Sequence, residues 1–474
     1  MKGFFQKIGV IAGALLGTAF SASGQDSSSL SRLTPEAFAT IVRTYHPVVQ
    51  QAAIGVAMAQ SSLTAARGGF DPAFYLNSEQ KTFNGTQYYQ YTNPELKIPT
   101  WYGIEVKTGL ESNGGAFLNS ESSIGKTSYL GVSVPLAKNL LMDKRRAVLQ
   151  QAKIYSKQAT AEQALMINDI LQESYEAYWN WAKSWQQWQV WEQAVALNAD
   201  RLSLVRIGWR QGDRPAIDTV EALAQLQQFQ MSASEARLQW LQAGIELSQY
   251  LWLPDGSSYQ LPETVQPDPY WMKQIVAEGS VPNLNELLEL SRTSHPALRI
   301  YDFKLQVLEV ERKLKFQSLL PTINLKANLL NKGYEVWKGV GVGFFENNNK
   351  FGIELGLPLR LSEGRGNYRA AKLKIQDTRY NYSLKQVSVT NKIRTYHASV
   401  TTLSQQIRLI EQAVQNYQTL FRGEDIRFKN GESSLFLLNS RENKVLEATQ
   451  KLIELRAKYF KTQIALLGAA GLLK

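Results

Sequence analysis

The sequence KFGIELGLPLRL, residues 350–361, alternates between two kinds of side chain. Every odd-numbered position from Phe351 to Leu361 is apolar, whereas the even-numbered positions hold Lys350, Glu354, Arg360 and small residues. Successive side chains of a β-strand point to opposite faces, so this stretch predicts a strand with one apolar and one polar face. Such alternation over about ten residues is typical of the wall of a membrane β-barrel.

The same alternation occurs in three further stretches. Residues 322–332 complete a hairpin over 321–361, and residues 102–110 and 130–136 belong to a hairpin over 71–136. Asn84-Gly85 signals a tight turn, so residues 87–98 are either an additional strand or part of a long external loop. Pro94 and Pro99 disfavour a regular internal strand. We therefore favour the loop and expect about four strands per chain.

Two long stretches lack helix breakers. Residues 141–207 contain neither Gly nor Pro, and as one helix they would measure about 100 Å. Residues 367–422 form a second such stretch, in which apolar residues step by three and four as in a coiled coil. Tyr178, Trp181, Trp185 and Trp188 follow the same spacing. We interpret these aromatic residues as a seam between helices rather than a ligand-stacking site.

The two halves of the chain repeat one another. Four pairs of matching segments occur in the same order: Tyr45-His46-Pro47 with Ser294-His295-Pro296, Phe70-Asp71-Pro72 with Leu319-Leu320-Pro321, Val134-Pro135-Leu136 with Leu357-Pro358-Leu359, and the segment 207–212 with 426–431. The offset is 249 for the first two pairs, 223 for the third and 219 for the fourth. The fall from 249 to 223 places 26 additional residues in the strand region of the first half. Ordered matches of this kind predict an internal duplication.

The chain begins with the pattern of a secretory signal peptide. Lys2 and Lys7 accompany an apolar core over residues 8–20, and Ala22-Ser23-Gly24 is a small-residue cleavage site. We expect residues 1–24 to be removed on export. The apolar core is too short to cross a bilayer as a helix.

These signals together predict the domain organisation. The first repeat is expected over 30–252 and the second over 284–474, with a proline-rich connector over 253–283 between them. After an initial helix, the first repeat should contain the hairpin 71–136, a long helix 140–208, a tip turn 209–215 and a helix 216–252. The second should contain the hairpin 321–361, a long helix 365–427, a tip turn 428–434 and a helix 435–467.

The strands cannot close a barrel within one chain. Two hairpins fall short of the eight strands of the smallest usual barrel, and open sheet edges cannot sit in hydrocarbon. Copies related by cyclic symmetry must therefore share one barrel, and three copies would supply about 12 strands. The predicted fold class is an α+β membrane protein with a two-fold internal repeat, in which a trimeric β-barrel is continued by a long α-helical barrel.

Composition argues against several other functions. The formal charge is +11 and the pI about 9.4, but Lys and Arg are interspersed with acids along the helices, so we expect solvated helix faces and no nucleic acid. The three histidines are scattered, and two occupy the matching His-Pro positions, where a structural role is expected. No Walker motif, metal-ligand spacing or nucleophile elbow occurs. We expect no enzyme activity, no catalytic residue, no metal and no cofactor.

Residues 30–470 resemble the TolC family of outer-membrane efflux proteins in the order of signal peptide, duplicated halves, hairpins and long helices. The resemblance implies a homotrimer whose barrel lies in outer-membrane lipid and whose helical tunnel extends into the periplasm. It also implies a passive duct of a tripartite efflux or type I secretion system, with a periplasmic adaptor (membrane fusion) protein and an inner-membrane pump as partners. A periplasmic adaptor and an extended coiled-coil adhesin or structural protein are the alternatives.

The turns at the helical tips are the candidate functional positions. Gly212 and Gly431 are expected to supply the positive φ of helix-ending turns, and Trp209 and Phe428 accompany them as candidate residues for adaptor docking. The resemblance also implies that acids just past the glycine narrow the periplasmic entrance.

The matching acidic positions are Asp218 and Glu221, whereas the second repeat has Leu437 and Ser440. A symmetric ring of carboxylates would attract cations. The alternative for Asp218 is a first-turn acid that is favourable to the helix dipole.

Overall fold

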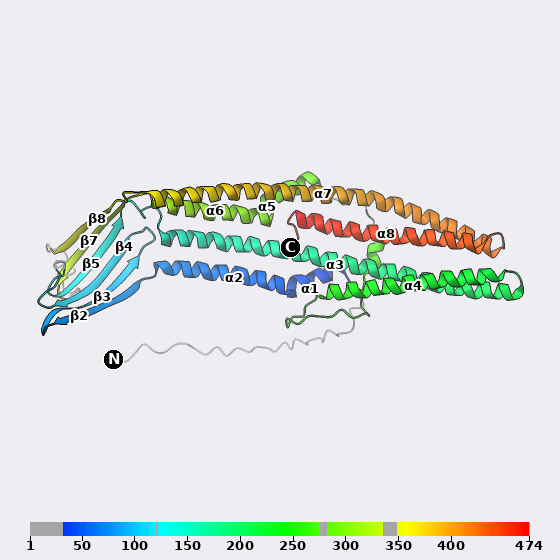
Figure 1. Ribbon diagram of the computed structural model, residues 1–474, viewed down its shortest axis with the longest axis horizontal. Coiled ribbons are helices and arrows are strands. Elements are labelled where there is room, and N and C mark those ends of the chain that lie inside the picture. Colours follow the sequence, from blue (N-terminus) through cyan, green and yellow to red (C-terminus); the bar gives the residue numbers. More distant parts are fainter. Residues whose placement is uncertain (1–31, 120–121, 275, 277–281, 335–347, 474) are drawn as a thin grey trace, which may run out of the picture.

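The computed structural model describes residues 32–119, 122–274, 276, 282–334 and 348–473. The molecule is elongated, with a β-sheet at one end, two helical hairpins at the other and a shaft of helices between them (Figure 1). The signal peptide expected at residues 1–24 lies outside the described residues, as does part of the connector.

Each repeat contributes four helices within the described residues. Those of the first repeat are α1 (Pro35–Tyr45), α2 (Pro47–Arg67), α3 (Lys144–Gln211) and α4 (Ala216–Ser248). Those of the second repeat are α5 (Leu284–Ser294), α6 (Pro296–Gln317), α7 (Ser362–Lys429) and α8 (Leu435–Ala469). The helices α3 and α7 have 68 residues each and run from the sheet to the tips (Figure 1).

In the shaft α2 packs on α3, α3 on α6 and α6 on α7. Among the described helices, none combines the length and the apolar character that a membrane crossing needs.

The sheet contains six antiparallel strands in the order β2-β3-β4-β5-β7-β8. They are β2 (Ala73–Phe83), β3 (Thr86–Pro99), β4 (Glu105–Gly114), β5 (Gly125–Pro135), β7 (Thr322–Lys332) and β8 (Asn349–Gly356). The repeats meet where β5 pairs with β7. A 3-10 helix, η1 (Gly68–Phe70), connects α2 to β2, whereas β8 leads into α7.

The expectation of about four strands per chain is wrong, because residues 86–99 form a strand instead of a loop. Asn84 and Gly85, with φ of 50° and 75°, make the tight turn that the sequence signalled. Pro94 lies at an interruption of the β3–β4 ladder, between the pairs Thr92↔Ser112 and Glu95↔Gly109. The register is the same on both sides of this gap, so the missing N–H of Pro94 interrupts the ladder locally without shifting it. Pro99 is the last residue of β3.

The strand register gives the sheet one apolar and one polar face. Opposite residues of an antiparallel pair project from the same face. The apolar pairs include Phe74↔Leu96, Ile98↔Val106, Val106↔Val132, Leu130↔Leu329, Leu325↔Ile353 and Ile323↔Leu355. On the other face Asn324 lies opposite Glu354, and Lys326 Nζ lies 2.9 Å from Glu354 Oε2. The alternation expected for β7 and β8 is thus confirmed. On β2 and β3 the same face is apolar only near the shaft, because farther out it carries the pairs Ser78↔Thr92 and Gln80↔Gln90.

A buried hydrophobic core near the middle of the molecule's long axis, here called the waist, packs the helices against one another (Figure 1). Tyr178 and Trp181 of α3 are almost fully buried, and the hydroxyl of Tyr178 donates to the carbonyl of Leu33 over 2.7 Å. Trp188 stacks on Trp240 of α4 with ring centroids 4.9 Å apart. These contacts confirm that the aromatic residues form a seam between helices. The connector joins this core through η2 (Pro269–Met272) and through β6 (Gln266–Pro267), which pairs with β1 (Arg32–Leu33).

Two histidines join helices end to end at the waist, one in each repeat. Nδ1 of each imidazole accepts a hydrogen bond from the backbone N–H two residues later, over 3.2 Å for His46 and 3.1 Å for His295. His46 thereby caps α2 and also hydrogen-bonds the backbone of Gln249 at the end of α4. His295 caps α6 and hydrogen-bonds the backbone of Ala469 at the end of α8. The repeated His-Pro motif therefore has a structural role.

The caps require neutral imidazoles, because a protonated Nδ1 is a donor and cannot accept. Burial lowers the pKa of His46, against the hydrogen bond to Gln249, which raises it. Burial likewise lowers the pKa of His295, and Lys385 and Lys392 add to this effect, whereas the hydrogen bond to Ala469 and the nearby Asp169 oppose it.

We expect the two histidines to make stability fall at acidic pH. Their folded pKa values lie below the reference value of 6.5, so the unfolded chain binds more protons, and their contribution is full above pH 6.5 and lost as pH falls below it. A lost cap costs about 1 kcal/mol. The double variant His46→Asn/His295→Asn keeps a capping acceptor that does not titrate.

Thermal unfolding followed by circular dichroism from pH 7.5 to 5 should therefore depend less on pH in the double variant than in the natural protein. His397→Asn, within α7, is the matched control. Equal pH dependence in all three proteins would show that the caps do not titrate.

Candidate functional site

Both helical hairpins end in tight turns that contain a left-handed glycine. Gly212 has φ of 85° and Gly431 has φ of 79°, which confirms the positive φ predicted for them. At the first turn the N–H of Asp213 donates to the carbonyl of Gly208 over 2.9 Å, and an equivalent bond of 2.8 Å closes the second turn. These bonds satisfy carbonyls that the end of a helix would leave without partners.

The two aromatic residues predicted at the tips lie in different environments. Trp209 is 47% exposed. Phe428 lies inside the tip, in a cluster with Leu202 and Leu438, and the guanidinium of Arg214 stacks 3.9 Å above its ring. Phe428 is therefore a packing residue and does not lie on the surface where a docking residue was expected.

The two predicted entrance acids lie near the first tip, and each contacts a neighbour in the same chain. Asp218 Oδ2 lies 3.6 Å from Nη1 of Arg214. Glu221 accepts a hydrogen bond from Nδ2 of Asn439 on α8 over 3.1 Å. Asp218 also lies in the first turn of α4, a position that suits the alternative of helix-dipole stabilisation. Because Arg214 pairs with Asp218, this acid adds less net charge to the first tip than an unpaired carboxylate would.

A buried polar network links the two hairpins close to the tips. Arg201 of α3 pairs with Glu442 of α8 through Nη1–Oε2 and Nη2–Oε1 distances of 2.5 and 3.2 Å. Asn198 donates to Glu442 over 3.1 Å and accepts from Arg201 over 3.0 Å. Arg201 also donates to Asn439 over 3.4 Å, so the network continues to Glu221. Glu442 and Asn198 are only 5% and 2% exposed.

The repeat contains a signal for this network that our sequence reasoning missed. At the offset of 219 that aligns the tips, Arg201 matches Leu420 and Glu442 matches Leu223. Each partner of the ion pair thus replaces a leucine of the other repeat. Two opposite charges that replace apolar residues on different helices indicate a buried pair, because an unpaired buried charge is too costly.

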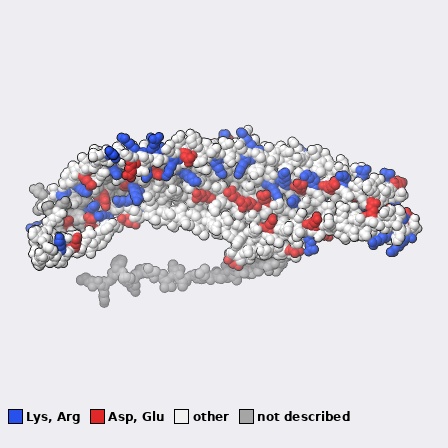
Figure 2. Space-filling model, viewed as in Figure 1, with Lys and Arg blue, Asp and Glu red and all other residues white. Residues whose placement is uncertain are grey.

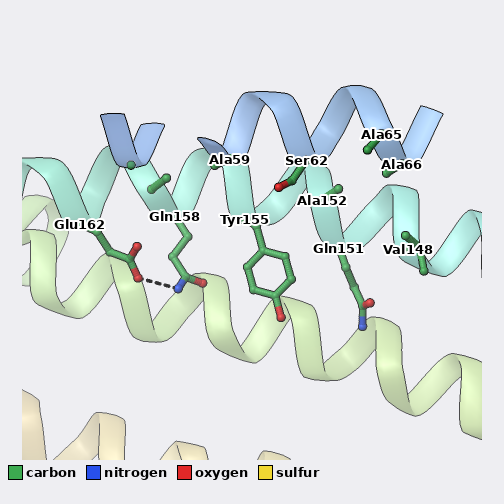
Figure 3. Close-up of a pocket in the computed structure, with 12 residues that line it drawn as sticks. Ala59, Ser62, Ala65, Ala66, Val148, Gln151, Ala152, Tyr155, Gln158 and Glu162 are labelled. Carbon is green, nitrogen blue, oxygen red and sulfur yellow. Dashed lines mark hydrogen bonds between the residues drawn. The ribbon is translucent and has the colours of Figure 1, made fainter. Parts of the chain in front are cut away.

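A groove of about 640 Å³ lies between α2 and α3 (Figure 3). Small residues of α2, including Ala59, Ser62 and Ala66, form one side, and Tyr155 and Gln158 project from α3 (Figure 3). Glu162 is the only charged residue in its lining. Within the described part of the chain, no cluster of three or more His, Cys, Asp or Glu residues could hold a metal.

Comparison with known families matches most of the chain to one family. Residues 42–251 and 287–472 match the sequence pattern described as outer membrane efflux protein. The matched ranges cover α2 to α4 in the first repeat and α6 to α8 in the second. No curated protein matches the chain.

Solved structures of outer-membrane channels share the fold. The CmeC outer membrane channel of Campylobacter jejuni is 14% identical, with a TM-score of 0.63 over 93% of this chain and 86% of that chain. The outer membrane protein VceC of Vibrio cholerae is 15% identical, with 0.62 over 92% and 96%. The open state of the MtrE outer membrane channel of Neisseria gonorrhoeae is 15% identical, with 0.64 over 93% and 89%.

Removal of one partner of the buried ion pair should destabilise the tips. Glu442→Leu leaves Arg201 buried without its partner, which we expect to cost about 3–5 kcal/mol. Arg201→Leu/Glu442→Leu copies the leucines of the other repeat, and we expect it to recover most of the loss, because an apolar pair can replace a buried ion pair at little cost.

Amide hydrogen exchange of the tip segments near residues 198–205 and 435–445 measures this local stability. Gln227→Ala, on the exposed surface of α4, is the control and should leave the exchange unchanged. A double variant that is as unstable as Glu442→Leu would contradict this interpretation of the network.

Proposed function

The chain belongs to the outer membrane efflux protein family, and from that premise we propose that three copies form a passive duct through the outer membrane. Their sheets close into one β-barrel in the membrane, and their helices continue the duct into the periplasm. The duct performs no chemistry of its own and draws on a partner for energy. It serves as the outer-membrane component of a tripartite efflux or type I secretion system.

The observation that carries this proposal is the division of the sheet into two faces. Large apolar residues on one face are exposed, as with Ile353 at 65% and Phe74 at 68%. Exposed apolar area of this extent is unfavourable in water but suits lipid tails. The opposite face carries the ion pair of Lys326 with Glu354, together with Asn324 and Asn328 of β7. A polar face of this kind suits a water-filled interior.

The sheet also supports an assembly of several copies. It is open within the described residues, since β2 and β8 each pair on one side only. Open edges leave backbone groups without partners, which hydrocarbon does not tolerate. Copies arranged with cyclic symmetry remove both edges at once. Among the cyclic assemblies that would close the sheet edges, we propose the homotrimer.

The tips form the periplasmic entrance of this duct. Asp218 and Glu221 place carboxylates there in every copy, and their ring attracts cations chiefly through Glu221, because Arg214 offsets the charge of Asp218. The pair Arg201–Glu442 fixes α3 against α8 and so restrains the hairpins from separating. Opening of the entrance by movement of one hairpin has to stretch or break this network.

The tips also offer a surface to a periplasmic adaptor, which in turn contacts an inner-membrane pump. Trp209 is exposed beside Gly212, and Gly431 marks the second turn. Lys and Arg side chains gather at the tip end of the molecule (Figure 2), and exposed members include Arg206, Arg210, Arg427 and Lys429. A basic tip of this kind favours an adaptor with acidic residues at its docking end.

A charge on the apolar face should prevent assembly in the membrane, whereas a charge on the polar face should not. Ile353 lies on the apolar face of β8, whereas Asn324 lies on the polar face of β7, opposite Glu354. We expect Ile353→Lys to cost about 2–4 kcal/mol, the usual range for a cation that faces lipid, and Asn324→Lys to have little effect, because its ammonium would face the carboxylate of Glu354.

The amount of heat-sensitive oligomer in outer-membrane fractions measures the difference. If both variants assembled equally, the apolar face would not be the lipid-facing surface. The mass of the natural protein in detergent tests the trimer and should equal about three chain masses.

A further inference from the structure

We propose that each copy contributes all six strands to the shared barrel and that β8 of one copy pairs with β2 of the next, which closes 18 strands. This inference rests on the trimer proposed above. It specifies which strands form the contact between copies, in what register, and how wide the barrel is.

The two strands at the edges of the sheet run in compatible directions. β2 follows α2 and points away from the shaft, whereas β8 points toward the shaft and leads into α7 (Figure 1). When copies stand side by side around a common axis, β8 and the neighbouring β2 are therefore antiparallel, as are all pairs within the sheet. A ring built this way has no unpaired strand edge.

The junction between the two repeats is an internal template for this contact. There β5, which leads into α3, pairs with β7, which follows α6, and α3 packs on α6 beneath them. In the second repeat β8 and α7 occupy the places of β5 and α3, and in the first repeat β2 and α2 occupy the places of β7 and α6. The contact between copies therefore repeats a contact that already exists inside each copy.

The offsets between the two repeats predict which residues of β8 and of the neighbouring β2 lie opposite one another. Inside the chain Val134 lies opposite Leu325. The offset of 223 carries Val134 to Leu357, and the offset of 249 carries Leu325 back to Leu76. The template thus places Leu357 opposite Leu76 of the next copy. By the same offsets, the neighbouring bond from the N–H of Leu136 to Ile323 corresponds to Leu359 and Phe74.

This register keeps the two faces of the sheet continuous. Even-numbered residues of β2, such as Phe74 and Leu76, lie on the apolar face, and so do odd-numbered residues of β8. A shift by a single residue would place the apolar set of one copy on the polar side of the next. The offset of 249 comes from the His-Pro motifs and from the prolines that precede β2 and β7, which lie outside the alternating stretches, and it gives the parity of β2 that the two faces require.

The residues just after β8 support the same pairing. The alternation of the sequence continues through Leu357 and Leu359, which are 67% and 96% exposed, but β8 ends at Gly356, opposite the first residue of β7. Among the described residues of the same chain, no strand lies opposite Leu357 or Leu359. The equivalent Val134 lies opposite Leu325 of β7, and the equivalent Leu136 donates its N–H to the carbonyl of Ile323. A neighbouring β2 supplies the missing partner and extends β8 by a few residues.

The strand number has a consequence for the cargo. Barrel diameter grows roughly linearly with strand number, so 18 strands make the barrel about 1.5 times as wide as 12 would. Barrels of 16–18 strands leave an aqueous channel between their side chains. The membrane part of the duct then admits bulky cargo, and the narrowest point lies at the helical end.

Paired cysteines test the contact directly, because the natural chain contains no cysteine. We expect Leu76→Cys/Leu357→Cys to form disulfides between neighbours on oxidation and to give a covalently closed trimer on a boiled, non-reducing gel. Asn77→Cys/Leu357→Cys places the two thiols on opposite faces, beyond the span of a disulfide, and we expect on the order of tenfold less cross-linked trimer from it. Heat-sensitive migration before oxidation confirms that each variant has assembled.

A second set of pairs tests a narrower barrel, in which the β2–β3 hairpin is excluded and β4 meets β8. Leu357→Cys combined in turn with Val106→Cys, Thr108→Cys and Leu110→Cys covers the apolar face of β4. Cross-links from these pairs, or none from Leu76→Cys/Leu357→Cys in an assembled trimer, would overturn the proposal.

Electron cryo-microscopy of the natural protein in detergent gives the strand number without any variant. A count of 18 supports the proposal, and a smaller count overturns it while the trimeric duct stands. A monomeric mass in detergent would instead overturn the trimer and this contact together.

Discussion

A backbone N–H or C=O group that has no partner in hydrocarbon costs several kcal/mol, and the arrangement of this chain follows from that constraint. Hydrogen bonds between six strands satisfy the interior of the sheet, and only its two edges need another copy. Successive side chains of a strand point to opposite faces, so Ile353 and Glu354 lie on different faces of the sheet. The β5–β7 junction shows that this chain already closes one such contact within itself.

The helices extend the same duplication beyond the sheet. The strands β2, β5, β7 and β8 connect to the shaft helices. Aromatic packing around Tyr178 and Trp181 holds these helices together at the waist. His46 and His295 connect helix ends at equivalent places in the two repeats. The two repeats differ at the tips, where Arg201 and Glu442 occupy positions that hold leucines in the other repeat. The tips are thus the part in which the repeats have come to differ, as expected if they carry the control of the entrance.

Sequence patterns predicted the parts of the structure that depend on local periodicity. The long helices, the faces of β7 and β8, and the left-handed conformations of Gly212 and Gly431 follow from apolar spacing and turn chemistry. The additional strand at residues 86–99 was missed because a single proline leaves only a local gap in the β3–β4 ladder, and the pairs on either side of that gap are a tertiary property that the sequence does not show. Phe428 and the Arg201–Glu442 pair were missed for a similar reason, since burial between different helices is a tertiary property.

The central claim is that the apolar face meets lipid and the polar face meets water inside a closed barrel. Single cysteines at each position from Ile323 to Leu329, labelled with a nitroxide in reconstituted membranes, test it most directly. We expect accessibility to oxygen, which is concentrated in lipid, to peak at Ile323, Leu325, Ala327 and Leu329, and accessibility to a water-soluble nickel complex to peak at the residues between them. Accessibilities that rise and fall together, or that show no period of two, would contradict the account.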